Sequence, residues 1–344
     1  MRLFVILMAL MLAACERAEP SGVTELVYAS PYSPSHPFSQ ADQDWMSFVE
    51  RESGGMIRIH PIWSGALLSS DQSMEELRHD VADIGLITPI YTKGGAHLIR
   101  IQSGFYSGAK TFESQVALYN CMAANDPEFA RELNGLQVLA VQGGSLPGII
   151  TKNVRVRDLD DLKGLRIRAP TELLNVLRDL GVDPVNMPMG DVYSALAKDI
   201  IDGVVAPADT FKSLHFAEVS RYFYLLEIPR GAYPARAMSR KKWDSLTETD
   251  RQILKRGVGV WEKALAHQTE KAVAEGLELA KDNGIEFHDA TPEDQEKFNE
   301  LYLREARRNA ASLKRYGIDG MAAFETARAS IRPDGTITCK DPSL

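Results

Sequence analysis

Two sets of alternating strand-like and helix-like segments constrain the fold of this 344-residue chain most strongly. In the first set, residues 24–29, 56–60 and 84–88 have the apolar and β-branched patterns of strands, and residues 38–53 and 73–80 read as helices between them. Alternation of this kind implies crossover units that build a parallel sheet with both faces covered. We therefore predict an α/β lobe in the N-terminal half.

The pattern recurs later in the chain, and the segment QGGSLPG at residues 142–148 separates the two sets. Before this segment lies a strand at 137–142, and after it lie strands at 148–152, 165–169 and 203–206 and helices at 171–181 and 191–197. Two such sets predict two α/β lobes. Ligands of proteins with this organisation usually bind at the carboxyl ends of strands and in the cleft between lobes.

Residues 248–283 contain no proline and three glycines, and they predict one long helix. Thr247 and Asp250 resemble an N-terminal cap, and Asn283-Gly284 resembles a C-terminal stop. At 1.5 Å per residue the helix would be roughly 50 Å long, which exceeds the width of one lobe. It should therefore run along both lobes. One helical face is apolar, with spacings of four, three and four residues between Leu254, Val258, Trp261 and Leu265.

The N-terminus, MRLFVILMALMLAACERAEP, is typical of an export signal that is short for a membrane span. Its Leu-Ala-Ala-Cys sequence resembles a bacterial lipobox, so we predict a lipoprotein signal peptide at 1–14, lipidation of Cys15 and a tether at 15–23. The protein would then be periplasmic and would contact the membrane through this lipid. The alternative is a secreted protein in which Cys15 is incidental.

Two further cysteines, Cys121 and Cys339, leave a choice open. An oxidising compartment makes a disulfide between them plausible. Separation along the sequence does not give the distance between two residues in the fold, however. Two unpaired, buried thiols are therefore an equally good alternative.

Charge and motifs argue against several classes of function. The formal net charge of -8 offers no broad basic surface for nucleic acid. No HExxH, CxxC or phosphate-binding glycine motif occurs, and the S-x-x-K match at Ser239 to Lys242 lacks the accompanying motifs of serine acyl-transferases. We expect no catalytic residues, metal or cofactor, and an exported enzyme is the weakest hypothesis.

Five segments in order resemble the DctP-like solute-binding proteins of TRAP (tripartite ATP-independent periplasmic) transporters. They are HPF at 36–38, FVERESGGMIRIHPIWSGAL at 48–67, DLKGLRIRAP at 161–170, LGVDPVNMPMGDVYSALAKDIIDGVVAP at 180–207 and KKWDSLTETDRQIL at 241–254. The resemblance implies a two-lobed, periplasmic-binding-protein-like fold that closes on a small organic acid and delivers it to membrane permease subunits. A receptor that feeds a membrane sensor kinase is the alternative.

The resemblance and the strand pattern together divide the chain as follows. Lobe I would comprise residues 24–145 and 233–260, and lobe II residues 146–232 and 261–325. Residues 326–344 would form a C-terminal tail.

Arg168 is the residue to which the resemblance assigns the ligand carboxylate. A guanidinium offers two parallel donors to a carboxylate, and an aliphatic strand holds its stem in place. The alternative is that Arg168 pairs with a neighbouring acid such as Glu172. Some family members have a side-chain amide within the segment that corresponds to residues 204–207, where it helps to bind the ligand carboxylate, and this chain has none there. Some members also carry a second arginine at the position of Gly148. We therefore expect a monocarboxylate and a less ionic pocket.

Other candidate ligand-binding residues lie at predicted strand ends. Aromatic rings can enclose an apolar ligand body, and amide, hydroxyl and carboxyl groups can hold its hydroxyls. Each also has an ordinary alternative, such as a core position or a helix cap. The candidates are Tyr32, Trp63, Ser64, Tyr91, Gln142, Thr151, Asp209 and Phe211.

Overall fold

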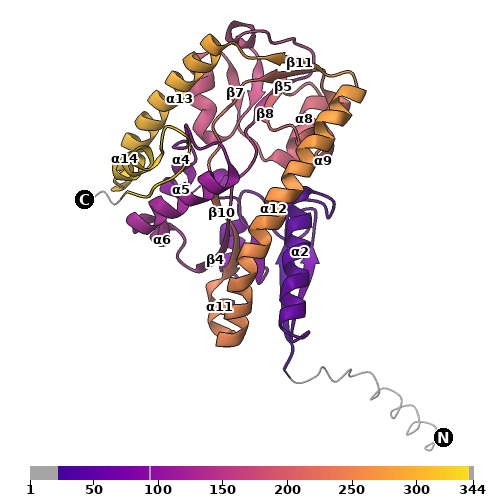
Figure 1. Ribbon diagram of the computed structural model, residues 1–344, viewed down its shortest axis with the longest axis vertical. Helices are drawn as coiled ribbons and strands as arrows, with labels where there is room; N and C mark the ends of the chain where they lie inside the picture. The colour runs from indigo at the N-terminus through magenta and orange to yellow at the C-terminus, as the bar shows by residue number, and fades with distance from the viewer. Residues whose placement is uncertain (1–21, 93, 341–344) are drawn as a thin grey trace, which may run out of the picture.

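The computed structural model describes residues 22–92 and 94–340, so the predicted signal peptide, Cys15 and most of the tether lie outside the described residues. Two lobes, each built on one mixed β-sheet, lie one above the other in Figure 1. The long helix α12, Glu248–Asp282, runs along both of them (Figure 1). The chain has the predicted two-lobed α/β fold.

The sheet of lobe I has five strands within the described residues, in the order β2-β1-β3-β10-β4. Strands β1 and β2 are parallel, as are β1 and β3, whereas β10 is antiparallel to both β3 and β4. Their bounds are β1 Thr24–Ala29, β2 Ile57–Ile62, β3 Ile84–Leu86, β4 Leu136–Gln142 and β10 Tyr233–Ser239.

The sheet of lobe II has six strands in the described chain, in the order β11-β9-β5-β8-β6-β7. Here β5 is antiparallel to β8 and β9, and the other pairings are parallel. Their bounds are β5 Gly148–Thr151, β6 Arg166–Arg168, β7 Asp183–Val185, β8 Gly203–Ala206, β9 Tyr222–Leu225 and β11 Glu286–Asp289.

The prediction of purely parallel sheets is therefore wrong for β5 and β10, and the crossings between the lobes explain why. The chain passes from β4 to β5 through residues 143–147 and from β9 to β10 through residues 226–232. Neither link is long enough for the helical crossover that a parallel neighbour requires. The carboxyl ends of the other strands face the junction between the lobes, so a strand that enters directly from the junction must run antiparallel.

Apolar side chains cover both faces of each sheet. In β1, Leu26 and Tyr28 belong to the core beneath α2 and α12, whereas Ala29 belongs to the core beneath α4 and α5. In β8, Val204 and Val205 divide in the same way between two cores. This alternation follows from the two-residue period of a strand.

Helices surround these sheets, and the predicted helix at 171–181 is split into a 3-10 turn and a short α-helix. In lobe I the helices are α2 Pro37–Glu52, α3 Ser73–Arg78, α4 His97–Gln102, α5 Phe112–Asn125, α6 Glu128–Glu132, α11 Arg240–Ser245 and α14 Gly320–Ser330. Elsewhere they are α7 Leu174–Asp179, α8 Val192–Ala197, α9 Thr210–Ser213, α10 Phe216–Val219 and α13 Pro292–Ser312. Turns of 3-10 helix occur at η1 Pro89–Tyr91, η2 Leu159–Leu162, η3 Thr171–Leu173, η4 Met189–Asp191 and η5 Leu313–Tyr316.

Glycines let α12 approach both lobes closely. The Thr247 hydroxyl caps the helix by accepting a hydrogen bond from the Asp250 amide at 3.1 Å. A Cβ on Gly257 would lie 2.6 Å from Nε1 of Trp45 in lobe I, and one on Gly276 would lie 2.3 Å from the Ala208 carbonyl oxygen in lobe II. Close packing at these two points therefore requires glycine.

The C-terminal residues fold back onto lobe I. Ala323, Phe324 and Ala327 of α14 belong to the core that α4 and α5 also cover, so the boundary expected at residue 325 falls within a packed helix. Cys339 forms a disulfide with Cys121 of α5, with 5.4 Å between their Cα atoms. This bond joins the end of the described chain to lobe I.

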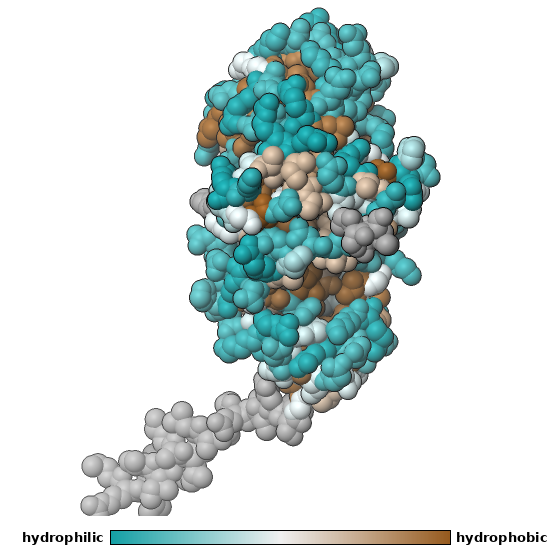
Figure 2. All heavy atoms as spheres, turned by 90° about the vertical axis from the view of Figure 1, so that its left-hand side faces the viewer, coloured by the Kyte–Doolittle hydropathy of each residue, from teal (hydrophilic) through white to brown (hydrophobic). Residues whose placement is uncertain are grey.

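The face of the molecule in Figure 2 is mostly hydrophilic, with hydrophobic side chains visible in patches. Within the described residues, no helix is both long enough and apolar enough to cross a membrane.

Candidate functional site

A cavity of about 100 Å³ lies between the lobes, where the carboxyl ends of the strands face each other. A single buried water needs roughly 10–15 Å³ of such space, so the cavity is large enough for a small molecule. Lobe I contributes Tyr32 and Tyr91, lobe II contributes Arg168 and Asp209, and the second interlobe link contributes Arg230. The cavity is therefore formed by both lobes and by the segment that connects them.

Arg168, at the end of β6, is only 2% exposed. Its Nε donates to the Met187 carbonyl at 3.0 Å, and its Nη2 donates to the Tyr91 hydroxyl at 2.6 Å. Its guanidinium carbon also lies 5.7 Å from the centre of the Tyr91 ring. No acid of the described chain forms an ion pair with it, so the alternative pairing with Glu172 is not found. The positive charge remains available to a ligand.

Arg166, two residues earlier on the same strand, has a different role. Its Nε and Nη2 donate to the two oxygens of Asp202 at 3.0 and 2.7 Å. This bidentate pair is half-exposed and belongs to the rim of lobe II. The arginine closer to the carboxyl end of β6 is therefore the one that reaches the cavity.

Two hydrogen bonds cross between the lobes at this point. One is the bond from Arg168 to Tyr91, and the other runs from the Thr171 hydroxyl to the Ile90 carbonyl at 3.3 Å. Because both join lobe II to lobe I across the cavity, the lobes are closed in this structure.

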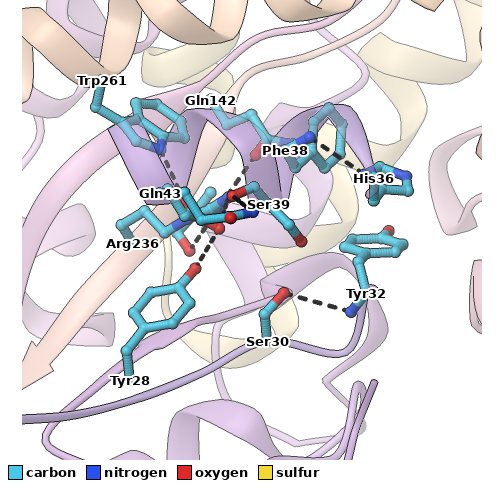
Figure 3. Close-up of polar contacts among 12 residues, drawn as sticks. Tyr28, Ser30, Tyr32, His36, Phe38, Ser39, Gln43, Gln142, Arg236 and Trp261 are labelled. Atoms are coloured by element: carbon cyan, nitrogen blue, oxygen red, sulfur yellow. Dashed lines mark hydrogen bonds and ion pairs between the residues drawn. The ribbon is translucent and has the colours of Figure 1, made fainter. Parts of the chain in front are cut away.

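Tyr32 and His36 form an aromatic wall in lobe I. Their rings stack with centroids 4.0 Å apart and an interplanar angle of 18°, as Figure 3 shows. His36 also caps α2, because its Nδ1 accepts a hydrogen bond from the Phe38 amide at 3.2 Å. Burial, together with the charges of Arg236 and Arg230, lowers the pKa of His36 to about 3. This histidine is therefore neutral near pH 7.

Arg230 is a second arginine in the cavity, which the sequence interpretation missed. Its Nη1 donates to the Ser145 carbonyl at 3.3 Å, so it joins the two interlobe links. A Cβ on Gly144 would lie 2.2 Å from the guanidinium carbon of Arg230, so any larger residue there would displace this guanidinium. The expectation of a weakly ionic pocket without a second arginine is wrong, because Arg230 arrives from a segment far from Gly148 in sequence.

Two carboxyl groups also line the cavity. Asp209 is 4% exposed, and burial raises its pKa to about 6 against the opposing effects of Arg230 and of a 3.2 Å hydrogen bond from the Ser213 hydroxyl. Burial also raises the pKa of Glu172, against the opposing effects of a hydrogen bond from Ser103 and of the charges of Arg168 and Arg230, and its Oε2 is buried without a hydrogen-bond partner. The cavity thus holds two acceptor groups that the protein itself satisfies incompletely.

The structure brings together four of the predicted residues, namely Arg168, Asp209, Tyr32 and Tyr91. The other five do not line the cavity. Phe211 packs in the lobe II core against Phe223, Trp63 packs edge-on against Tyr28, Ser64 is exposed, and the Thr151 hydroxyl donates to the Val154 carbonyl at 2.5 Å. Gln142 is fully buried behind the cavity wall.

Gln142 connects the cavity wall to a buried ionic network. Its amide nitrogen donates to the hydroxyl of Tyr233, which lines the cavity, and its oxygen accepts from Arg236 at 3.2 Å. Arg236 in turn forms a bidentate pair with Asp42, at 2.6 and 3.1 Å. Figure 3 shows Tyr28 and Trp261 converging on the same region, and both donate to Asp42. The network joins β1, α2, β4, β10 and α12.

A sequence signal existed for only some of the missed residues. His36 stands in the HPF segment, directly before a helix, where a cap is expected. Arg230 lies in the run Ile-Pro-Arg-Gly before β10, and nothing in that run indicates which lobe or cavity it faces. Its place depends on how the second link crosses between the lobes.

Residues 28–311 match the family described as bacterial extracellular solute-binding protein, family 7, or DctP, and the chain belongs to this family. It is a DctP-like solute-binding protein of the TRAP type. This family and the structural relatives of the chain are solute receptors, not enzymes.

The chain is similar to a TRAP solute-binding protein from Rhodoferax ferrireducens T118 in complex with copurified benzoate. The identity is 25%, the TM-score is 0.79, and the match covers 89% of this chain and 97% of the other. A TRAP protein from Desulfovibrio salexigens, described as an open complex, is 26% identical with a TM-score of 0.69 and coverages of 89% and 95%. The sialic acid-binding periplasmic protein SiaP of Vibrio cholerae is 28% identical over 152 residues, which are 44% of this chain and 46% of SiaP.

Proposed function

We propose that this receptor binds a small organic monocarboxylate in the interlobe cavity, with the carboxylate held by Arg168. The observation that carries the proposal is the state of the Arg168 side chain. It is buried, it is oriented by Met187 and Tyr91, and no acid among the described residues lies within ion-pair distance of it. A buried cation that the protein leaves unpaired is costly unless a ligand supplies the opposite charge.

The charges around the cavity favour one carboxylate over two. Arg168 and Arg230 supply two positive charges, and Asp209 and Glu172 supply two negative charges when both are ionised. Because burial raises the pKa of both acids, one of them can take up a proton when an anion enters. A monocarboxylate is then neutralised when one acid is protonated, whereas a dicarboxylate would need both acids to be protonated.

Two named relatives support a single carboxylate in this size range. The Rhodoferax protein holds benzoate, and a Nostoc relative that is 25% identical over 180 residues is a monocarboxylate 2-oxoacid-binding periplasmic protein. Sialic acid and 2,3-diketo-L-gulonate, for which two other relatives are named, also carry one carboxylate each, whereas a Bacillus subtilis relative is named for C4-dicarboxylates. The support for a monocarboxylate therefore comes mainly from the charges of this cavity.

Binding would work by lobe closure. A carboxylate on Arg168 also meets Tyr91 and Arg230, which lie on lobe I and on the link, so these contacts exist together only when the lobes are closed. A ligand that makes more contacts in one state shifts the population to that state. The closed receptor would then deliver the acid to the membrane permease subunits of a TRAP transporter, and a lipid on Cys15 would keep it at the membrane.

A thermal-shift screen of the mature protein against organic acids, followed by calorimetry, tests the proposal. Ligands that bind the folded state raise the melting temperature. For an acid found in this way, Arg168→Ala should weaken binding by roughly 100-fold or more, because it removes a buried charged hydrogen-bond donor. Arg166→Ala, on the same strand but paired with Asp202, is the matched control and should leave the affinity nearly unchanged. Equal affinities of the Arg168→Ala and parent proteins would refute the assignment.

A further inference from the structure

Two carboxyl groups of the cavity can accept hydrogen bonds, and a ligand whose only polar group is a carboxylate offers them no donor. Asp209 is held from one side by the Ser213 hydroxyl, and no cation of the described chain lies within ion-pair distance of it. Glu172 places a buried Oε2 beside the same cavity without a donor. An apolar ligand body against these groups would leave them desolvated and unpaired, which disfavours binding.

The loop that carries Asp209 is also firmly positioned. The residue follows β8 through Pro207 and Ala208, and Ala208 contacts Gly276 of α12 so closely that a Cβ there would clash. The Thr210 hydroxyl donates to the Pro207 carbonyl at 2.6 Å and closes the turn. A carboxyl group fixed in this way can discriminate between ligands, because it cannot turn away from a poor partner.

We propose that Asp209 is a specificity residue that accepts a hydrogen bond from a hydroxyl or amine of the ligand, so that the cavity selects carboxylic acids with a donor group away from the carboxylate. This inference rests on the proposed function, since it takes Arg168 as the carboxylate site. A ligand of this class satisfies Arg168 with its carboxylate and Asp209 with its donor, and Glu172 offers a second acceptor. Sites built to bind a donor reject analogues that lack it far more strongly than apolar pockets reject a missing methylene.

The test compares acids that differ only in this group. The aliphatic set is 3-hydroxybutanoate, 3-aminobutanoate and 3-methylbutanoate, and the aromatic set is 3-(hydroxymethyl)benzoate, 3-(aminomethyl)benzoate and 3-ethylbenzoate. In each set the third acid replaces the donor by a methyl group of similar size. Calorimetry with the full mature protein should give at least one donor-bearing acid about 10-fold or more tighter binding than its methyl analogue.

Variants then assign the preference to a residue. Asp209→Leu should reduce the preference to less than about threefold, with Asp209→Ala as a second variant in case the first does not fold. Asp209→Asn distinguishes the two donors, because an amide oxygen still accepts from a hydroxyl but gives no charge to an ammonium group. Asp183→Asn, an exposed aspartate on the edge strand of the same lobe, is the control and should behave as the parent.

Each outcome decides between named alternatives. Equal binding of the methyl analogues by the parent protein would overturn the inference but leave the carboxylate site intact. A preference that survives Asp209→Leu and disappears in Glu172→Gln would also overturn it, since the acceptor would then be Glu172. Failure of all six acids, and of every organic acid in the thermal-shift screen, to bind would contradict the carboxylate receptor itself.

Discussion

Gly276 should be important for the close contact between the long helix and the cavity loop. In the interior of an exposed helix, Gly→Ala stabilises by about 1 kcal/mol because alanine has the higher helix propensity. At Gly276 the new Cβ would lie 2.3 Å from the Ala208 carbonyl oxygen and 3.2 Å from Cα of Asp209, so helix and loop must move apart. Overpacking of this kind typically costs 1–3 kcal/mol. Gly276→Ala should therefore be neutral or destabilising by up to about 2 kcal/mol.

Gly259 provides the matched control on the same helix. It is exposed, and a Cβ there would meet no atom within 4 Å, so Gly259→Ala should be stabilising by up to about 1 kcal/mol. Denaturant unfolding of both variants measures the difference, which we expect to be about 1–3 kcal/mol. Calorimetry with a bound acid should show weaker binding only for Gly276→Ala, because only this substitution displaces Asp209. Equal stability and equal affinity of the two variants would refute the argument.

Three further predictions concern stability. Asp42→Ala should lower the free energy of unfolding by about 3–5 kcal/mol, because it leaves the buried Arg236 without its counter-charge, whereas Asp44→Ala on the exposed side of α2 should change it little in the same denaturant titration. The pKa of Asp209 is about 6 in the folded protein and 3.8 ordinarily, so protonation of this group favours the folded state. Its contribution to the free energy of unfolding is fully present below pH 4 and is lost as the pH rises through 6. Between pH 4 and 7 the parent protein should therefore lose about 3 kcal/mol that the Asp209→Asn variant does not lose, and identical pH profiles of the two proteins would contradict the shift. Cys121→Ser should lower the unfolding free energy by about 2–5 kcal/mol under oxidising conditions, and no difference from the parent protein would show that the disulfide does not form.

The sequence pattern was sufficient to predict those helices and strands that are determined by residues close together in the chain. The long helix was predicted from its cap at Thr247 and from its apolar face, and it ends at Asp282, as the Asn283-Gly284 stop indicates. The strand that holds Arg168 was predicted from its alternation and from the proline that follows it. In these cases the residues that decide the structure are neighbours in sequence.

Features that depend on how distant segments meet were not predictable in this way. The direction of β5 and β10 follows from the crossings between the lobes, and the position of Arg230 follows from the same crossing. Gln142 was expected in the cleft because it ends a strand, yet its side chain turns toward Arg236, whose buried charge needs the amide oxygen. Sequence position indicated the right edge of the sheet but not which side chain would reach the cavity.

The crystal structure of the receptor with the tightest-binding acid from the screen is the most direct test of the central claim. We predict that both carboxylate oxygens lie within about 3 Å of the Arg168 guanidinium, with the lobes closed and Tyr91 in contact. A carboxylate bound elsewhere, or an Arg168 side chain turned onto Glu172 while the acid occupies the cavity, would contradict the account.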